Sequence, residues 1–435
     1  MSDEWGALGW GAWPVDSRLP GVPLDEESRV RASLPRTLVP VPGEGVVQRP
    51  VFDPALLHYA KAMRAGDPGF ADEETAAAWY AARAAAFGHV LAAVAESPWS
   101  GDLMLRGSFL LSSWFGPEAR PPGDLDFVVL PRSWRLADRR TGLLFDRLAR
   151  DAEERSHRGG AVRLSAEDAV SDEIWTYDRV PGRRLVLRWR DEGLPSGAVQ
   201  LDFTFGERLP SPPVLTEVPV PGEAGSVTLL AASPEQSLAW KILWLVTDMH
   251  PQAKDVYDAA LLAEVVSPDG RLLRETFVAS DTYYAAVAPK AEELAEAVTG
   301  VDWDEFRKEY PGFPFSAERM RERLPGRLAE VLAERVDPPG GEYERRAAWL
   351  APHIIEYRTT LAARGRDGVV RSLADERIRL IDAALIFNEV RGRPPGEVEA
   401  SARELLEHPD WPHGEVRYYG HDSKYLEAEL ASLRG

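Results

Sequence analysis

Two aspartates separated by one residue, Asp124 and Asp126, lie in a segment that alternates as a β-strand does. Residues at i and i+2 of a strand point to the same face, so we expect the two carboxylates to lie side by side, with Leu125, Phe127 and Val129 packed behind them. Adjacent carboxylates repel unless a cation neutralises them. Mg²⁺ prefers oxygen ligands and is often held by carboxylates together with substrate phosphates. The pair therefore predicts a Mg²⁺ (or Mn²⁺) site.

A Gly-Ser turn, Gly107 and Ser108, precedes a short apolar stretch with helical spacing over residues 109–115. The expected order is strand, turn and helix start, which directs backbone N–H groups at an anion and lets a phosphate approach the glycine closely. The Ser108 hydroxyl adds a donor. Each feature alone is also typical of an ordinary turn or a solvated strand. Together they favour transfer chemistry on a nucleoside triphosphate.

Asp202 is a third candidate carboxylate, because it is the only charged residue on the polar face of the predicted strand 198–205. Beside Asp124 and Asp126 it would hold metal or accept the proton of an attacking hydroxyl. An ordinary solvent-facing aspartate is the alternative, since the sequence does not tell which strands pair.

Lys241 interrupts the apolar stripe of a helix whose start is marked by Ser233 and Pro234. Lysines occur at 61, 241, 254, 290, 308 and 424, so six of the 51 basic residues are Lys and Arg is the usual cation of this chain. A Lys in an apolar stripe is consistent with an ammonium that reaches a triphosphate. Snorkelling to the surface is the alternative. Further on, Asp255 and Asp258 share one helical face.

Composition limits the class of protein. A chain of 435 residues with 44% hydrophobic residues predicts two or three folded domains, and the absence of Cys excludes disulfides and zinc thiolates. The net charge of −19 argues against a general nucleic-acid binder, although Arg132, Arg135, Arg139 and Arg140 cluster after the acid strand. With no apolar run of membrane-spanning length and no basic-then-apolar start, we expect a cytoplasmic protein that does not enter a membrane.

The ordered motifs resemble the AbiEii/AbiGii toxin-type nucleotidyltransferases of the polymerase-beta-like superfamily. That family carries a Gly-Ser-type turn, an Arg four residues before Asp-x-Asp, a helical Lys and an Arg-Asp-x-x-Asp segment. Gly107-Ser108, Arg120, Asp124-x-Asp126, Lys241 and Lys254-Asp255-x-x-Asp258 follow this order over residues 100–265. Lys254 stands where Arg is usual, and the stretch between the turn and the acids is longer than typical.

The resemblance implies a metal-dependent nucleotidyltransferase that moves a nucleoside monophosphate from a triphosphate to an acceptor hydroxyl. Asp124, Asp126 and Asp202 would bind metal, and Gly107, Ser108 and Lys241 would hold the phosphates. Arg120 would brace the acid loop or a phosphate, and Asp202 or Asp255 would orient or deprotonate the acceptor. It further implies a toxin with a cognate antitoxin, a role in phage defence, and tRNA as the first-choice acceptor. The alternatives are a protein or small-molecule acceptor, or a non-catalytic nucleotide-binding or partner-recognition module.

We expect an α+β fold: a small mixed sheet with flanking helices, as in polymerase-beta-like cores, followed by a mainly helical C-terminal domain. The expected segments are a Pro- and Gly-rich arm over 1–50, a nucleotidyltransferase core over 51–230 and a helical domain over 231–435. Within them we predict helices over 72–97 and 139–155 and strands over 184–190 and 198–205.

Overall fold

The computed structural model describes residues 5, 8, 13, 16–176, 180–310, 312–334, 336–421 and 423–434. The chain forms two compact units: unit 1 comprises Met1–Val266 and Leu294–Arg327, and unit 2 comprises Ser267–Glu293 and Leu328–Gly435. This division differs from the three expected segments, because helices α6 (Pro234–Thr247) and α7 (Ala253–Val265) belong to unit 1. Most of residues 1–15 of the expected arm lie outside the described residues.

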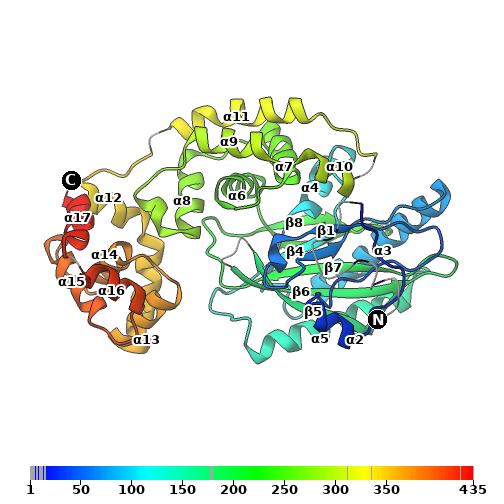
Figure 1. Ribbon diagram of the computed structural model, residues 1–435, viewed down its shortest axis with the longest axis horizontal. Coiled ribbons are helices and arrows are strands. Elements are labelled where there is room, and N and C mark those ends of the chain that lie inside the picture. Colours follow the sequence, from blue (N-terminus) through cyan, green and yellow to red (C-terminus); the bar gives the residue numbers. More distant parts are fainter. Residues whose placement is uncertain are drawn as a thin grey trace. The chain divides into compact units, whose positions relative to one another are not determined.

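Unit 1 is built on a seven-stranded mixed sheet with the order β5-β6-β7-β4-β3-β9-β8 (Figure 1). β4 runs parallel to β7 and β3 runs parallel to β9, whereas the other neighbours are antiparallel. The α+β class and the mixed sheet are thus confirmed, although the sheet is wider than predicted. The strands are β3 (Leu103–Arg106), β4 (Asp124–Val129), β5 (Arg163–Thr176), β6 (Val180–Arg190), β7 (Gly197–Thr204), β8 (Val214–Pro219) and β9 (Ser226–Ala231).

One face of the sheet, the back face, is apolar and packs against helices α3 (Glu73–Glu96) and α5 (Arg139–Arg158). Phe203 of β7 stacks on Phe127 of β4 at a ring distance of 5.4 Å and meets Phe145 of α5 edge-on at 4.9 Å. Leu125, Phe127 and Val129 are each at most 1% exposed, as the alternation predicted. Burial of this face leaves the alternate residues of β4 and β7 for the opposite, front face.

The N-terminal segment covers part of the front face. Its elements are α2 (Glu26–Arg31), β1 (Pro50–Phe52), η1 (Pro54–Leu56) and β2 (Met63–Ala65), with β1 and β2 forming a small antiparallel sheet. Leu56 packs against Ile174 of β5, and both Thr37 and Tyr59 donate hydrogen bonds of 2.7 Å to Asp172 of the same strand. The described part of the expected arm is therefore packed into unit 1.

Several further helices of unit 1 place polar or charged side chains above the front face. α4 (Ser108–Phe115) follows β3, the short η2 (Gly116–Glu118) leads back to β4, and α6, seen end-on in Figure 1, follows β9. The predicted start of α6 is confirmed: Pro234 is its first residue, and the Ser233 hydroxyl accepts a hydrogen bond from the Gln236 N–H at 3.2 Å. α7 and α10 (Trp303–Glu309) complete this group.

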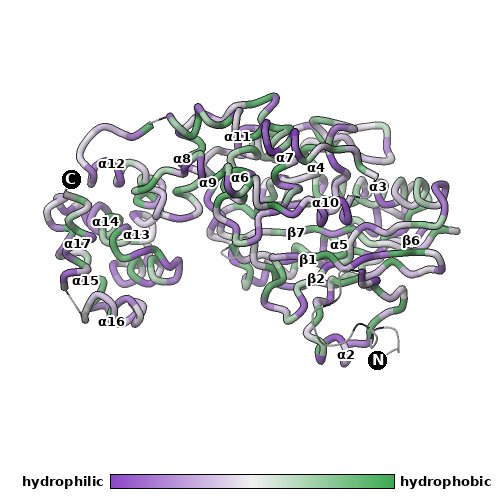
Figure 2. The backbone as a smooth tube through the Cα atoms, turned by 45° about the horizontal axis from the view of Figure 1, so that its top comes forward, coloured by the Kyte–Doolittle hydropathy of each residue, from purple (hydrophilic) through white to green (hydrophobic). Residues whose placement is uncertain are grey.

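Unit 2 consists of helices in its described residues. Its core is formed by Leu350, Val369, Leu385 and Phe387, each fully buried, and hydrophobic and hydrophilic stretches alternate along its tube in Figure 2. None of the described helices of the chain is long and apolar enough to cross a membrane. α9 (Ala291–Gly300) and α11 (Ala317–Ala333) contribute residues to both units. The elements within unit 2 are α8 (Gly270–Ser280), η3 (Thr282–Ala285), α12 (Glu342–Trp349), α13 (Ala351–Asp375), α14 (Leu380–Val390), η4 (Pro395–Glu397), α15 (Val398–Leu406), α16 (His413–His421) and α17 (Ser423–Arg434).

Candidate active site

A row of charged residues crosses the front face of the sheet. The strand register places Asp172 of β5 opposite Arg184 of β6, Arg184 opposite Asp202 of β7, Asp202 opposite Asp126 of β4, and Asp126 opposite Arg106 of β3. Residues at matching positions of paired strands share a face, so the five side chains lie on one side. The row is the base of the candidate site.

Asp126 and Asp202 of this row converge with Asp124, which lies two residues before Asp126 on β4, and one carboxylate oxygen from each of the three lies within 4.8 Å of the others. The pairing of β4 with β7, which the sequence did not reveal, creates this cluster. Burial and then the charges of Asp124 and Asp202 raise the pKa of Asp126 to about 8. Burial also raises the pKa of Asp202, against the opposing effect of Arg184. Three hard oxygen donors that repel one another form a set suited to a divalent cation.

The Gly-Ser turn lies directly against this cluster. Gly107 adopts φ of +83°, and a Cβ atom there would lie 2.2 Å from Oδ2 of Asp126, so the position admits no side chain. Ser108 is the first residue of α4, and its hydroxyl is 3.5 Å from Oδ1 of Asp124. The N–H groups at the start of α4 therefore lie next to the acids, as expected for a phosphate-binding turn.

Asp202 is held by an arginine. Nε and Nη2 of Arg184 donate to the two carboxylate oxygens of Asp202 at 2.8 and 2.7 Å, and Nη1 donates to Asp53 at 2.7 Å. Gln200 adds a longer contact of 3.2 Å to Asp202. Arg184 lies at the start of the strand predicted over 184–190, whereas no sequence pattern points to Asp53.

Lys241 and the aspartates of α7 form a second charged group. Nζ of Lys241 lies 2.7 Å from Asp255 and 2.9 Å from Asp258, which confirms that these aspartates share a helical face. Arg120 forms a two-point ion pair with Asp258, with both nitrogen–oxygen distances 2.9 Å, and donates to the Tyr310 hydroxyl at 2.5 Å. Burial opposes the charge of Lys241, but Asp255 and Asp258 raise its pKa above the usual value. Arg120 therefore braces α7 in this structure.

The two charged groups are joined through the N-terminal segment. Arg64 of β2 lies 3.9 Å from Asp53 and forms an ion pair with Glu309 of α10, and the Tyr310 hydroxyl donates to Glu309 at 3.0 Å. Burial opposes the ionisation of Glu309, but the charges of Arg64 and Lys254 lower its pKa to about 2. A chain of polar contacts thus leads from Asp202 to Lys241 within unit 1.

These residues surround a pocket of about 210 Å³. Gly107, Ser108 and the three clustered acids line it together with Arg120, Lys241 and Asp255, so the structure brings every predicted site residue to one pocket. Lys254 also lines it and forms no ion pair or hydrogen bond with the part of the chain that the structure describes. Sequence reasoning missed Asp53, Arg64 and Glu309, which are distant in sequence from the acid strand and carry no motif.

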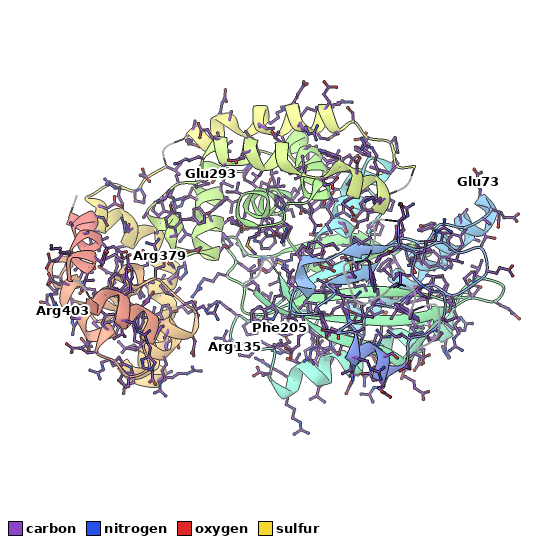
Figure 3. The ribbon with its side chains drawn as sticks, in the orientation of Figure 1. Glu73, Arg135, Phe205, Glu293, Arg379 and Arg403 are labelled. Atoms are coloured by element: carbon purple, nitrogen blue, oxygen red, sulfur yellow. The ribbon has the colours of Figure 1, made fainter. Side chains whose placement is uncertain are left out.

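The Arg cluster predicted after the acid strand lies after the C-terminal end of β4, and its first member contacts the residue that follows β7 by two positions. Nε of Arg132 donates to the Gly206 carbonyl at 3.0 Å, and Nη1 of Arg135 lies 3.3 Å from the position that a Cβ on Gly206 would take. Arg135 and Phe205, the residue after β7, are labelled in Figure 3. Arg135, Arg139 and Arg140 are exposed. None of the three lines the pocket.

A mixed sheet, a Gly-Ser turn against an acid cluster and a pocket lined by both acidic and basic side chains are the features expected of a nucleotidyltransferase. Residues 89–333, more than half of the chain, match the family model described as nucleotidyl transferase AbiEii toxin, type IV toxin–antitoxin system. The chain belongs to this family of nucleotidyltransferase toxins. The match extends the resemblance seen over 100–265 to residues on both sides and leaves the N-terminal segment outside.

A solved structure is also similar: MenT4, a nucleotidyltransferase toxin from Mycobacterium tuberculosis H37Rv, is 20% identical with a TM-score of 0.42. The similarity covers 66% of this chain and 94% of that chain. The comparison with curated proteins found no match.

Proposed function

We propose that this nucleotidyltransferase uses a divalent cation, Mg²⁺ or Mn²⁺, to transfer a nucleoside monophosphate from a nucleoside triphosphate to an acceptor hydroxyl. The observation that supports this most is the convergence of three carboxylates within 4.8 Å of one another beside the Gly-Ser turn. Asp124, Asp126 and Asp202 would hold the cation. Burial and then the charges of Asp124 and Asp202 raise the pKa of Asp126 to about 8, and a bound cation would offset both effects, so the residues present fit the ion.

In the proposed reaction the acceptor oxygen forms a bond to the α-phosphorus while the bond to the β-phosphate bridging oxygen breaks, and pyrophosphate leaves. A bound divalent cation supplies charge stabilisation for the phosphoryl oxygens. Gly107, Ser108 and the start of α4 bind the distal phosphates through N–H and O–H donors. Lys254 and Lys241 add positive charge on the pocket wall.

We assign the proton of the acceptor hydroxyl to Asp202. Asp202 lies opposite Asp126 in the strand register, whereas Asp255 accepts a 2.7 Å hydrogen bond from Lys241. Both carboxylates already accept hydrogen bonds, Asp202 from Arg184 and Asp255 from Lys241. We place the acceptor hydroxyl at Asp202 because Asp202 belongs to the acid cluster, and its carboxylate would take the hydroxyl proton, whereas Asp255 positions the ammonium of Lys241.

We further propose that the protein is the toxin of a type IV pair with an antitoxin, that it serves phage defence in the cytoplasm, and that tRNA is its acceptor. Membership of the AbiEii family supports the toxin role. The exposed Arg135, Arg139 and Arg140 offer cations for an RNA backbone, although the net charge of −19 favours a local contact over a broad basic surface.

The test incubates the protein with Mg²⁺, each α-labelled nucleoside triphosphate and either total tRNA or tRNA-free lysate. Asp126→Asn removes one acid from the cluster, and Asp146→Asn, an exposed aspartate on α5 away from the pocket, is the matched control. We expect nuclease-sensitive label in tRNA with the wild type and Asp146→Asn, and none with Asp126→Asn. Label in protein or a small molecule would replace the tRNA acceptor. Equal labelling by Asp126→Asn would refute the metal-site assignment.

A further inference from the structure

We propose that Asp53, in the N-terminal segment, is a positioning residue of the metal site, because it holds Arg184 in the orientation that presents Asp202 to the cation. This inference rests on the proposed function and deepens it. Asp53 precedes the family match over 89–333, so the N-terminal segment supplies a part of the active site that the family model does not include. Asp53 reaches the cation cluster only through Arg184 in the hydrogen bonds of the described residues.

The geometry around Arg184 fixes the whole guanidinium. Two of its nitrogens bind Asp202 and the third binds Asp53, at 2.7–2.8 Å. The side chain of Arg184 is 3% exposed, so water does not replace a lost partner easily. A planar guanidinium with acceptors on both sides can adopt only one orientation. Because Asp202 accepts two hydrogen bonds from this guanidinium, the orientation of its carboxylate is fixed as well.

Asp53 is itself rigidly held. Its Oδ1 accepts a hydrogen bond from the Ala55 N–H at 3.1 Å as the cap of η1, and its backbone N–H donates to the Ala62 carbonyl at 2.9 Å. The other carboxylate oxygen, Oδ2, is the acceptor for Arg184. The conformation of η1 therefore aims Asp53 at Arg184.

Charge gives a second reason for this arrangement. With all four carboxyl groups ionised, as when a cation is bound, the acids Asp124, Asp126, Asp202 and Asp53 and the cation Arg184 sum to −3, and replacing Asp53 by a neutral residue changes the sum to −2. Without Asp53, the whole positive charge of the Arg184 guanidinium would act on Asp202. Arg184 would then compete with the cation for the Asp202 carboxylate. The Asp53–Arg184 pair therefore leaves the charge of Asp202 for the metal.

The experiment measures Mn²⁺ binding to the full-length protein without nucleotide, by electron paramagnetic resonance of the free ion, and then the Mn²⁺ dependence of transfer. Asp53→Asn removes the charge, and Asp53→Glu keeps it. Tyr59→Phe is the matched control: it removes a 2.7 Å hydrogen bond from the same segment to Asp172 but does not touch Arg184 or the pocket. Thermal unfolding verifies that each variant is folded.

We expect Asp53→Asn to weaken Mn²⁺ binding about ten-fold, as second-layer partners of metal ligands do. The KM for Mn²⁺ should rise while kcat at saturating Mn²⁺ changes little, Asp53→Glu should restore most of the affinity, and Tyr59→Phe should bind as the wild type does. Unchanged binding by Asp53→Asn, or an equal loss in Tyr59→Phe, overturns the positioning role. Should Asp53→Asn not fold, Arg184→Lys tests the same bridge: the charge remains but the two-sided fork is lost, so weaker binding supports the role and unchanged binding overturns it.

The failure of the proposed function has a different signature. If the wild type binds no Mn²⁺, or if Asp126→Asn binds Mn²⁺ as well as the wild type does, the acid cluster is not a metal site. The proposed role of Asp53 is then refuted as well. If the wild type binds and Asp53→Asn binds equally well, only the role of Asp53 is refuted.

Discussion

At the scale of single residues, the contact between Gly107 and Asp126 has a direct consequence. In Gly107→Ala the new Cβ would meet Oδ2 of Asp126 at 2.2 Å, so the carboxylate or the turn must move. A displacement of about 1 Å in a catalytic group can reduce the rate about 100-fold. We therefore expect Gly107→Ala to lower nucleotide transfer about 100-fold, measured as initial rates at saturating metal and nucleotide.

Gly116→Ala is the control for backbone strain. Gly116 also has a positive φ, +55°, but a Cβ there meets nothing within 4 Å. It should lose stability by about 1–3 kcal/mol through strain alone and keep its transfer rate per folded molecule. Equal losses of activity in the two variants would show that the contact with Asp126 is unimportant.

Lys254 is the subject of a second prediction at this scale. It lines the pocket and forms no ion pair in the described part of the chain, although its charge helps to lower the pKa of Glu309, so a bound phosphate would share its charge with that carboxylate. Lys254→Ala should raise the KM for the nucleoside triphosphate about ten-fold, equivalent to about 1.4 kcal/mol, with a smaller change in kcat. The exposed Lys290 of unit 2, changed to Ala, is the control in the same steady-state assay. A KM equal to that of Lys290→Ala would exclude Lys254 from nucleotide binding.

The residues of the site were predictable to different extents. The period of two in residues 124–130 was enough to place Asp124 and Asp126 on one face. The partner of Lys241 was not foreseen, although the spacing of Asp255 and Asp258 was noted, because an ion pair between two helices depends on how they pack. Asp53 lies 131 residues from Arg184, and no local pattern reports such a contact.

At the scale of elements, long segments with clear periodicity were predicted well. The helix expected over 72–97 is α3, Glu73–Glu96, and the strand expected over 198–205 is β7, Gly197–Thr204. β5 was missed because its register shifts between Ser165 and Val170 and its sequence carries four acids, which hides the alternation. β1 and β2, with three residues each, are too short to show a period.

The packing of α3 gives a prediction at this scale. A Cβ on Gly88 would lie 2.3 Å from the Pro221 carbonyl oxygen, so α3 approaches the β8–β9 connection as closely as a glycine allows. Gly88→Ala should destabilise unit 1 by about 1–3 kcal/mol despite the better helix propensity of Ala. Differential scanning calorimetry should show a lower unfolding midpoint. Gly101→Ala, where a Cβ meets nothing within 4 Å, should unfold as the wild type does; a shift of equal size there would contradict the packing argument.

At the scale of the whole molecule, the chain leaves unit 1 at residue 266, returns over 294–327 and ends in unit 2. The predicted boundary at 230 follows the change from strands to helices, whereas the observed boundary follows the contacts within each unit. α6 and α7 are helical but carry Lys241 and Asp255 to the pocket of unit 1. Secondary structure is visible in a sequence, but the core to which a helix contributes is decided by long-range packing.

Unit 2 has a buried acid that should give it a pH dependence of its own. Asp382 is 1% exposed and accepts a hydrogen bond of 2.9 Å from Thr282, and burial raises its pKa from 3.8 to about 6. Between these values the folded state binds the proton and the unfolded state does not, so the free energy of unfolding falls as pH rises from about 4 to about 6. Two pKa units correspond to about 3 kcal/mol.

Asp382→Asn removes this dependence, because an amide does not ionise and its oxygen still accepts from Thr282. We expect the variant to be more stable than the wild type at pH 8 by about 3 kcal/mol and to lose the advantage near pH 4. Urea unfolding of wild type, Asp382→Asn and the exposed control Asp375→Asn across this range measures it. A difference between Asp382→Asn and wild type that stays constant with pH would mean that Asp382 has the same pKa in the folded and unfolded chain. A difference that grows from about pH 4 to about pH 6 and then stays level would support an ionisable Asp382 in the core of unit 2.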